Sequence, residues 1–253
     1  MIGKIFLVLC LLWNCRTPLI ACSSFENPNH PIMEQIHESS QVLDFARSIH
    51  WLGQATVKFV YHGLTIYIDP YRLESADKAD LILITHDHMD HLSPSDIAKI
   101  ANKNTKFIVA KPCEEKLKNE GYLNVQSVMP GETIEFKGLI IKTVPAYNIV
   151  KQYHKKNSNY LGFVIDFGGI SVYHTGDTER IPEMKQIRCD IILLPLGQTY
   201  TMNSVEEAVE AVLDTKASVV IPIHYGMYEG TGEDAVKFGE ILKKRNIKVL
   251  SGK

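Results

Sequence analysis

Four side chains that can bind a metal ion lie within six residues of the sequence. They are His86, His88, Asp90 and His91, in the pattern H-x-H-x-D-H. Neutral imidazole and carboxylate groups together suit zinc or another first-row divalent metal. The apolar run 81–84 comes directly before them and predicts a buried strand. A loop leaving a buried strand can hold ligands in fixed positions, so this stretch predicts a metal site.

Short β-rich and apolar runs predict the elements that would position this loop. Hairpins are expected at 55–61 with 64–69, 132–136 with 139–144, and 160–167 with 170–174. Further strands are expected at 80–85, 107–110, 191–194 and 219–223. Helices are expected at 94–102, 114–119, 205–213 and 233–245. Each half runs from antiparallel strands into alternating strands and helices, which predicts an α/β domain of two facing mixed sheets with helices outside.

Composition narrows the class of protein. The chain has 253 residues, of which 45% are hydrophobic and 22% charged, as is ordinary for a soluble globular domain. The formal net charge of −2 gives no basic footprint, so no nucleic-acid partner is predicted. The spacing of Cys113 and Cys189 gives no basis for inferring a disulfide between them.

The N-terminal segment has a different character from the rest. Lys4 precedes the apolar run 5–13, which is too short to span a bilayer and is typical of a signal peptide. Leu19-Ile20-Ala21-Cys22 resembles a bacterial lipobox, which would put a lipid on Cys22. We therefore expect a lipoprotein signal peptide at 1–21, a tether at 22–45 and a single folded domain at 46–253. The expected location is the bacterial cell envelope, anchored to the membrane by this lipid. Secretion without a lipid and a retained N-terminal anchor are the alternatives.

Several segments together resemble the metallo-β-lactamase superfamily. The segments are 85–91, 145–154, Tyr173-His174-Thr175-Gly176-Asp177-Thr178 and Ile221-Pro222-Ile223-His224. Segments 51–56, 68–70 and 197–202 are similar to one branch, which includes ascorbate-6-phosphate lactonase, N-acyl-phosphatidylethanolamine phospholipase D and many metal-dependent hydrolases. The resemblance covers about residues 48–250.

This resemblance implies a four-layer αββα sandwich with a site for two divalent metal ions. His86 and His88 would bind metal 1. Asp90, His91 and His224 would bind metal 2, and Asp90 would also take part in catalysis. Asp177 would bridge the two ions. Zn²⁺ is expected, with Mn²⁺ or Fe²⁺ as alternatives. A metal-bridged hydroxide would then cleave an ester, lactone, amide or phosphodiester in a small-molecule or lipid substrate.

The sequence departs from the superfamily pattern at the third ligand of metal 1. Relatives often have histidine where this chain has Asn148, and we expect His154, six residues later, to replace it. The alternative is that Asn148 lines the site and metal 1 is weak or absent. Gln54 also stands where relatives often have histidine, and it could contact a ligand or the substrate. Tyr200 could donate a hydrogen bond to an oxyanion or be an ordinary buried tyrosine. His174 is expected to be packed rather than to bind metal.

Two other classes of function compete with hydrolysis. One is an iron-dependent oxidoreductase of the sulfur dioxygenase type, since the same fold hosts redox members. The other is a non-catalytic, surface-anchored binding protein that keeps the fold without turnover. The full set of ligands argues against a protein without turnover, whereas the H-x-H-x-D-H pattern alone does not exclude an iron dioxygenase; the set is His86, His88, Asp90, His91, Asp177 and His224.

The lipobox generates a test of location. In a bacterial host the mature protein should begin with a lipidated Cys22 and sediment with membranes. Cys22→Ser should release the protein or leave it unprocessed, as fractionation and N-terminal mass spectrometry will show. Intact Met1 on protein in the soluble fraction would contradict the prediction.

Overall fold

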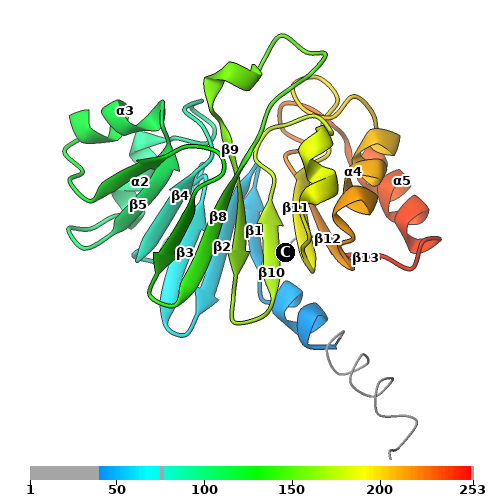
Figure 1. Cartoon of the computed structure of the whole chain (residues 1–253), viewed down its shortest axis with the longest axis horizontal. Coiled ribbons are helices and arrows are strands. Elements are labelled where there is room, and N and C mark those ends of the chain that lie inside the picture. Colours follow the sequence, from blue (N-terminus) through cyan, green and yellow to red (C-terminus); the bar gives the residue numbers. More distant parts are fainter. Residues whose placement is uncertain (1–39, 75–76, 252–253) are drawn as a thin grey trace, which may run out of the picture. The chain divides into compact units, whose positions relative to one another are not determined.

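The computed structural model describes residues 40–74 and 77–251 (Figure 1). The predicted signal peptide, Cys22 and tether residues 22–39 lie outside the described residues. Residues 40–47 are helical, and Val42 and Ala46 are buried in the core, so the packed domain already includes residues that the tether prediction covered. In the described part of the chain, no helix is both long enough and apolar enough to cross a bilayer.

One sheet is built from the N-terminal half of the chain. It contains six strands in sequence order: β1 (His50–Gly53), β2 (Thr56–Tyr61), β3 (Leu64–Ile68), β4 (Leu81–Ile84), β5 (Lys106–Ala110) and β6 (Val125–Val128). The first three strands pair antiparallel, and β3 to β6 pair parallel. Parallel neighbours need crossovers, and helices α2 (Pro94–Ile100) and α3 (Cys113–Asn119) provide those between β4, β5 and β6.

The second sheet repeats this plan in the C-terminal half. Its seven strands are β7 (Thr133–Phe136), β8 (Leu139–Pro145), β9 (Leu161–Asp166), β10 (Ser171–His174), β11 (Ile191–Pro195), β12 (Val219–Ile223) and β13 (Lys248–Val249). Strands β7 to β10 pair antiparallel and β10 to β13 pair parallel. The crossovers contain the 3₁₀ turn η2 (Pro182–Gln186) and helices α4 (Val205–Thr215) and α5 (Gly232–Lys243).

Alternating side chains sort the core into layers. Along β11, Ile191 and Leu193 pack between the two sheets, whereas Ile192 and Leu194 pack beneath α4 and α5. On the other side, α2 and α3 bury Ile97, Ile100 and Leu117 against the first sheet. Figure 1 shows the same arrangement, with α2 and α3 beyond one sheet and α4 and α5 beyond the other. The predicted αββα sandwich is therefore confirmed.

Local sequence signals account for the helix starts. The Ser93 hydroxyl caps α2, which has Pro94 at its first position, as its sequence predicted. The Ser204 hydroxyl likewise accepts the Glu207 amide at the start of α4. Strands β1, β6 and β13 were not predicted, because they are two to four residues long and their pattern of buried side chains is weak.

Two glycines give opposite tests of this packing. A Cβ on Gly162 in β9 would lie 2.8 Å from the Thr175 carbonyl oxygen and 2.9 Å from the Tyr173 ring, whereas a Cβ on Gly239 in α5 would meet nothing within 4 Å. Gly162→Ala should lower the free energy of unfolding by about 1–3 kcal/mol. Gly239→Ala should raise it by up to about 1 kcal/mol, because alanine favours the helix. Urea unfolding of both variants measures this, and equal effects would contradict the packing described.

Candidate metal centre

The candidate ligands follow the carboxyl ends of parallel strands in both sheets. The loop after β4 carries His86, His88, Asp90 and His91. In the second sheet, Asp177 follows β10 and His224 follows β12. The carboxyl ends of parallel strands meet at one edge, which is where open α/β sheets bind their ligands.

Backbone hydrogen bonds join the two sheets at this edge. The Leu161 amide of β9 donates to the Thr85 carbonyl at 3.0 Å, and the His224 amide donates to the Gln54 carbonyl at 2.7 Å. The first bond links a loop of the first sheet to β9 of the second, and the second bond links a loop of each sheet. Ligands contributed by the two halves of the chain are thereby held at fixed separations.

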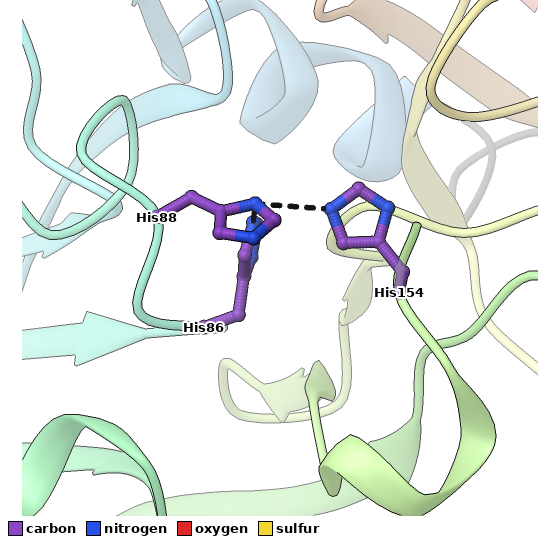
Figure 2. A group of neighbouring side chains, drawn as sticks. All are labelled: His86, His88 and His154. Carbon is purple, nitrogen blue, oxygen red and sulfur yellow. Dashed lines mark hydrogen bonds between the residues drawn. The ribbon is translucent and has the colours of Figure 1, made fainter. Parts of the chain in front are cut away.

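One group of ligand atoms contains three imidazoles. His86 Nε2 lies 3.1 Å from His88 Nδ1, and His154 Nε2 lies 3.2 Å from the same nitrogen. Figure 2 shows the three rings converging, His86 and His88 from the loop after β4 and His154 from the loop between β8 and β9. The three ligand atoms all lie within 4.8 Å of one another, so a single ion could contact all three.

A second group of ligand atoms contains Asp90, His91 and His224. Asp90 Oδ2 lies 3.5 Å from His91 Nε2 and 3.7 Å from His224 Nε2. These atoms also lie within 4.8 Å of one another. The structure therefore brings together every residue that the sequence predicted for metal 2.

The Asp177 carboxylate lies between the two groups. Its Oδ2 lies 3.1 Å from His224 Nε2, 3.4 Å from His91 Nε2, 3.6 Å from His154 Nε2 and 3.9 Å from His86 Nε2. Asp177 Oδ1 and His91 Nε2 are buried without a hydrogen-bond partner among the described residues. Buried polar atoms of this kind need a partner. The donor set and these unpartnered atoms fit a pair of divalent ions flanking Asp177.

Buried Asp69 orients two of the imidazoles from behind. Its Oδ2 accepts the His91 Nδ1 hydrogen at 2.8 Å and the Thr85 hydroxyl at 2.6 Å, and its Oδ1 accepts the Thr85 amide. The Thr85 oxygen in turn lies 2.9 Å from His86 Nδ1. Asp69 could reach a metal together with His86 and His91. Its oxygens already accept these hydrogen bonds, so it orients ligands rather than binding an ion.

Glu229 performs the same task for His224. Its Oε1 lies 2.9 Å from His224 Nδ1, and its Oε2 accepts the Thr199 and Tyr200 amides at 2.8 and 2.6 Å. Gly197 leaves the space this side chain occupies, since a Cβ there would lie 1.8 Å from Glu229 Cδ. No ligand spacing in the sequence marked Glu229, and Asp69 stood out only as part of the superfamily resemblance.

A hydrogen-bonded loop presents His154. Glu179 accepts the backbone amides of residues 149, 150 and 151 at 2.7–2.9 Å. His154 Nδ1 lies 3.2 Å from the Tyr200 carbonyl oxygen, which leaves Nε2 directed at the other imidazoles. Asn148 donates to the same carbonyl at 2.7 Å and lies behind His154, 3.4 Å from its Nδ1. The geometry thus favours His154 over Asn148 as the third ligand.

Burial and neighbouring charges shift the pKa values of the buried imidazoles in opposite directions. Burial, reinforced by the positive charge on His91, lowers the pKa of His86 well below its usual value. Burial also opposes charge on His91, but Asp177 and Asp69 outweigh it and raise the pKa of His91 well above normal. Asp177 has the same net effect on His224. Because only a neutral imidazole binds a metal, the protons that His91 and His224 hold more tightly would compete with an ion.

The remaining predicted residues surround the cluster. The Gln54 side-chain nitrogen lies 2.8 Å from both Asp90 Oδ2 and His224 Nε2, so Gln54 touches candidate ligands. Tyr200 is half-buried and lines the pocket above them. His174 is packed as predicted, with Nε2 2.9 Å from the Ala55 carbonyl oxygen. Cys113 and Cys189 are free, buried thiols in separate clusters, and burial raises the pKa of Cys189 to about 12.

The choice between His154 and Asn148 has a direct test. After zinc loading and dialysis, His154→Ala should retain about one ion per chain, because three imidazoles cannot be replaced by two without a large loss of affinity. Asn148→Ala should retain two ions. His50→Ala changes an exposed histidine and serves as the control. Elemental analysis gives the ratios, and the reverse pattern would assign the ligand position to Asn148.

Comparison with known proteins gives the family. The family model of the β-lactamase superfamily domain matches residues 48–224. A UPF0173 metal-dependent hydrolase of Thermoplasma acidophilum is 39% identical over 204 residues, which cover 72% of this chain and 89% of the relative. A solved structure described as a metal-dependent hydrolase from Parabacteroides distasonis is 31% identical, with a TM-score of 0.71 over 81% of this chain and 91% of its own.

The same fold occurs in a redox enzyme. CmlA, a diiron β-hydroxylase from Streptomyces venezuelae, has a TM-score of 0.67 over 81% of this chain and 52% of its own, at 16% identity. At that identity the likeness shows the fold alone. The family model and the more similar relatives place the chain by sequence as well as by fold. The chain belongs to the metallo-β-lactamase superfamily and, within it, to the UPF0173 family of metal-dependent hydrolases.

Proposed function

We propose that the protein hydrolyses an ester, lactone, amide or phosphodiester with two divalent metal ions, zinc being the first candidate. One observation carries the proposal. Asp177 Oδ2 lies 3.1–3.9 Å from the Nε2 atoms of four histidines that belong to two separate ligand groups. A carboxylate in that position can serve both groups at once, which is the requirement for a bridging ligand.

The residues divide between the two ions by their positions. His86, His88 and His154 would hold the first ion, and Asp90, His91 and His224 the second. Imidazole and carboxylate donors in these proportions suit zinc, and they also accommodate manganese or iron. When bound, the ions would lower the pKa of a shared water and polarise the scissile group.

The protein's own side chains would hold the substrate and the metal ligands in position. Asp90 lines the pocket and receives a hydrogen bond from Gln54 through Oδ2, so its carboxylate is held in one position beside the reacting groups. Tyr200 lines the same pocket, where its hydroxyl could donate to a developing oxyanion. The buried carboxylates of Asp69 and Glu229 keep the imidazoles in place, which limits the reorganisation needed during reaction.

The competing functions have weaker support. The diiron enzyme resembles this chain in fold alone, whereas relatives at 39% and 31% identity are described as hydrolases. A binding protein without turnover has no need of a complete set of ligands, and seven candidate ligands converge here. We further propose that the enzyme acts at the bacterial cell envelope, tethered by the lipid on Cys22.

Removing the proposed bridge tests the function. Asp177→Asn keeps the side-chain shape but weakens metal binding, so it should leave fewer than two ions per chain. Hydrolysis should fall at least about a hundredfold. The substrates are a panel of lactones, aryl esters, phosphodiesters and N-acyl amides, offered to zinc- and manganese-loaded protein. Asp44→Asn removes an exposed carboxylate as the control. An Asp177→Asn variant with two ions at normal affinity would exclude the bridging role.

A further inference from the structure

The pocket above the candidate metal ligands is lined by aromatic and apolar side chains. It has a volume of about 530 Å³, which suits a small-molecule group. Beyond the candidate ligands, its lining consists of four tyrosines and one methionine, namely Tyr71, Tyr153, Tyr200, Tyr228 and Met89. No lysine or arginine is among the lining residues in the described part of the chain.

The hydroxyl groups at one side of the pocket bond to each other. The Tyr71 and Tyr228 hydroxyl oxygens lie 2.5 Å apart, so one hydroxyl donates its hydrogen to the other. On the other side, the rings of Tyr153 and Tyr200 meet edge to face with centroids 5.1 Å apart. Besides hydroxyl groups, these four side chains therefore offer a ligand a large area of aromatic surface.

Cations on the surrounding loops have other partners. The loops after β3, β4, β8, β11 and β12 carry five basic side chains in their described residues, and one of them, Lys78, binds the Lys99 and Ala101 carbonyls. Arg72 contacts the Tyr71 ring and the Met227 sulfur, and Lys151 binds the Thr201 carbonyl and Asn203. Lys155 binds Gln152, and Lys156 binds Glu183 and the Tyr147 hydroxyl. None of these cations is among the lining residues, so a negatively charged group held against the pocket wall, remote from the metals, would be desolvated without a cation in contact.

The rim of the pocket exposes apolar surface. Met89 is 81% exposed, Tyr153 51% and Tyr228 47%, although all three line the pocket. Ile149 and Val150, on the loop that carries His154, are also exposed. Exposed apolar side chains that cluster at one concave site are typical of a binding surface.

We infer that this site selects an uncharged substrate whose acyl group is apolar, such as a medium-chain ester, lactone or amide, and disfavours substrates bearing a phosphate or carboxylate on that group. This rests on the proposed function, since the metal ligands form the pocket floor. The metals would take the reacting group, and the tyrosines and Met89 would bury the acyl group.

Hydroxamates test metal binding and the acyl preference of the pocket separately. The hydroxamate group chelates the metal, and the attached acyl chain contacts the pocket. Three probes are titrated calorimetrically into zinc-loaded protein: acetohydroxamate, octanohydroxamate and suberic acid monohydroxamate, which ends in a carboxylate. Octanohydroxamate should bind at least about tenfold more tightly than acetohydroxamate. The carboxylated probe should lose at least about tenfold relative to octanohydroxamate.

Two variants connect the preference to the pocket. Met89→Ser and Tyr153→Ser, each checked for unchanged metal content, should reduce the ratio of octanohydroxamate to acetohydroxamate affinity at least about threefold. Leu123→Ser removes an equally apolar side chain that is 94% exposed and does not line this pocket, and it should leave the ratio unchanged.

The outcomes distinguish the two proposals. If acetohydroxamate binds but chain length has no effect, or the carboxylated probe binds as tightly as octanohydroxamate, the inference about the substrate is wrong and the metal centre stands. If zinc-loaded protein binds no hydroxamate at all, the proposed function fails, and this inference fails with it.

Discussion

Contacts between oxygen atoms and the Nδ1 atoms of the buried imidazoles are the interaction on which the candidate site depends. Four histidines have an oxygen near Nδ1: Thr85 for His86, Asp69 for His91, Tyr200 for His154 and Glu229 for His224. An imidazole whose Nδ1 donates its hydrogen leaves Nε2 as a lone-pair donor. The four Nε2 atoms consequently face Asp177, and a buried cluster that would otherwise reorganise has a fixed set of metal-binding atoms.

These partners also explain how the two halves of the sandwich cooperate. Asp69 follows β3 of the first sheet and Glu229 lies in a loop of the second, so each half orients one of the imidazoles proposed to bind the second ion. Glu229 additionally accepts amides from residues 199 and 200, and the Tyr200 carbonyl then fixes His154. One buried carboxylate therefore acts on ligands in both groups. Its desolvation is offset by the His224 imidazole and by these amides, which together hold the pKa of Glu229 below normal.

Sequence reasoning predicted the architecture and the ligands that lie close together along the chain. The H-x-H-x-D-H loop and the strands before it follow from local pattern, because strand ends and ligand spacing are local properties. His154 could be proposed from its neighbourhood to Asn148, but its approach to His88 depends on Glu179 and Tyr200, which are distant in sequence. No strand pattern or ligand spacing indicated the roles of Asp69 and Glu229. Their role arises from tertiary contacts with Nδ1 atoms, which no period or spacing encodes.

The apolar pocket illustrates the same limit. Its tyrosines come from four loops of the two sheets, and no run of the sequence marks them as neighbours. The loops lie together because backbone bonds such as that from His224 to Gln54 join the sheets at the ligand edge. The pocket that would set specificity thus depends on how loops of the two sheets come together. The positions of the metal ligands depend instead on where the strands end.

A crystal structure of zinc-soaked protein, with anomalous data collected on both sides of the zinc edge, tests the central claim most directly. The account predicts two anomalous peaks flanking Asp177, one within about 2.3 Å of nitrogens of His86, His88 and His154, the other equally near Asp90, His91 and His224. Asp69 and Glu229 should remain on the Nδ1 atoms of His91 and His224. A single peak, or a zinc ion bound directly by Asp69, would contradict it.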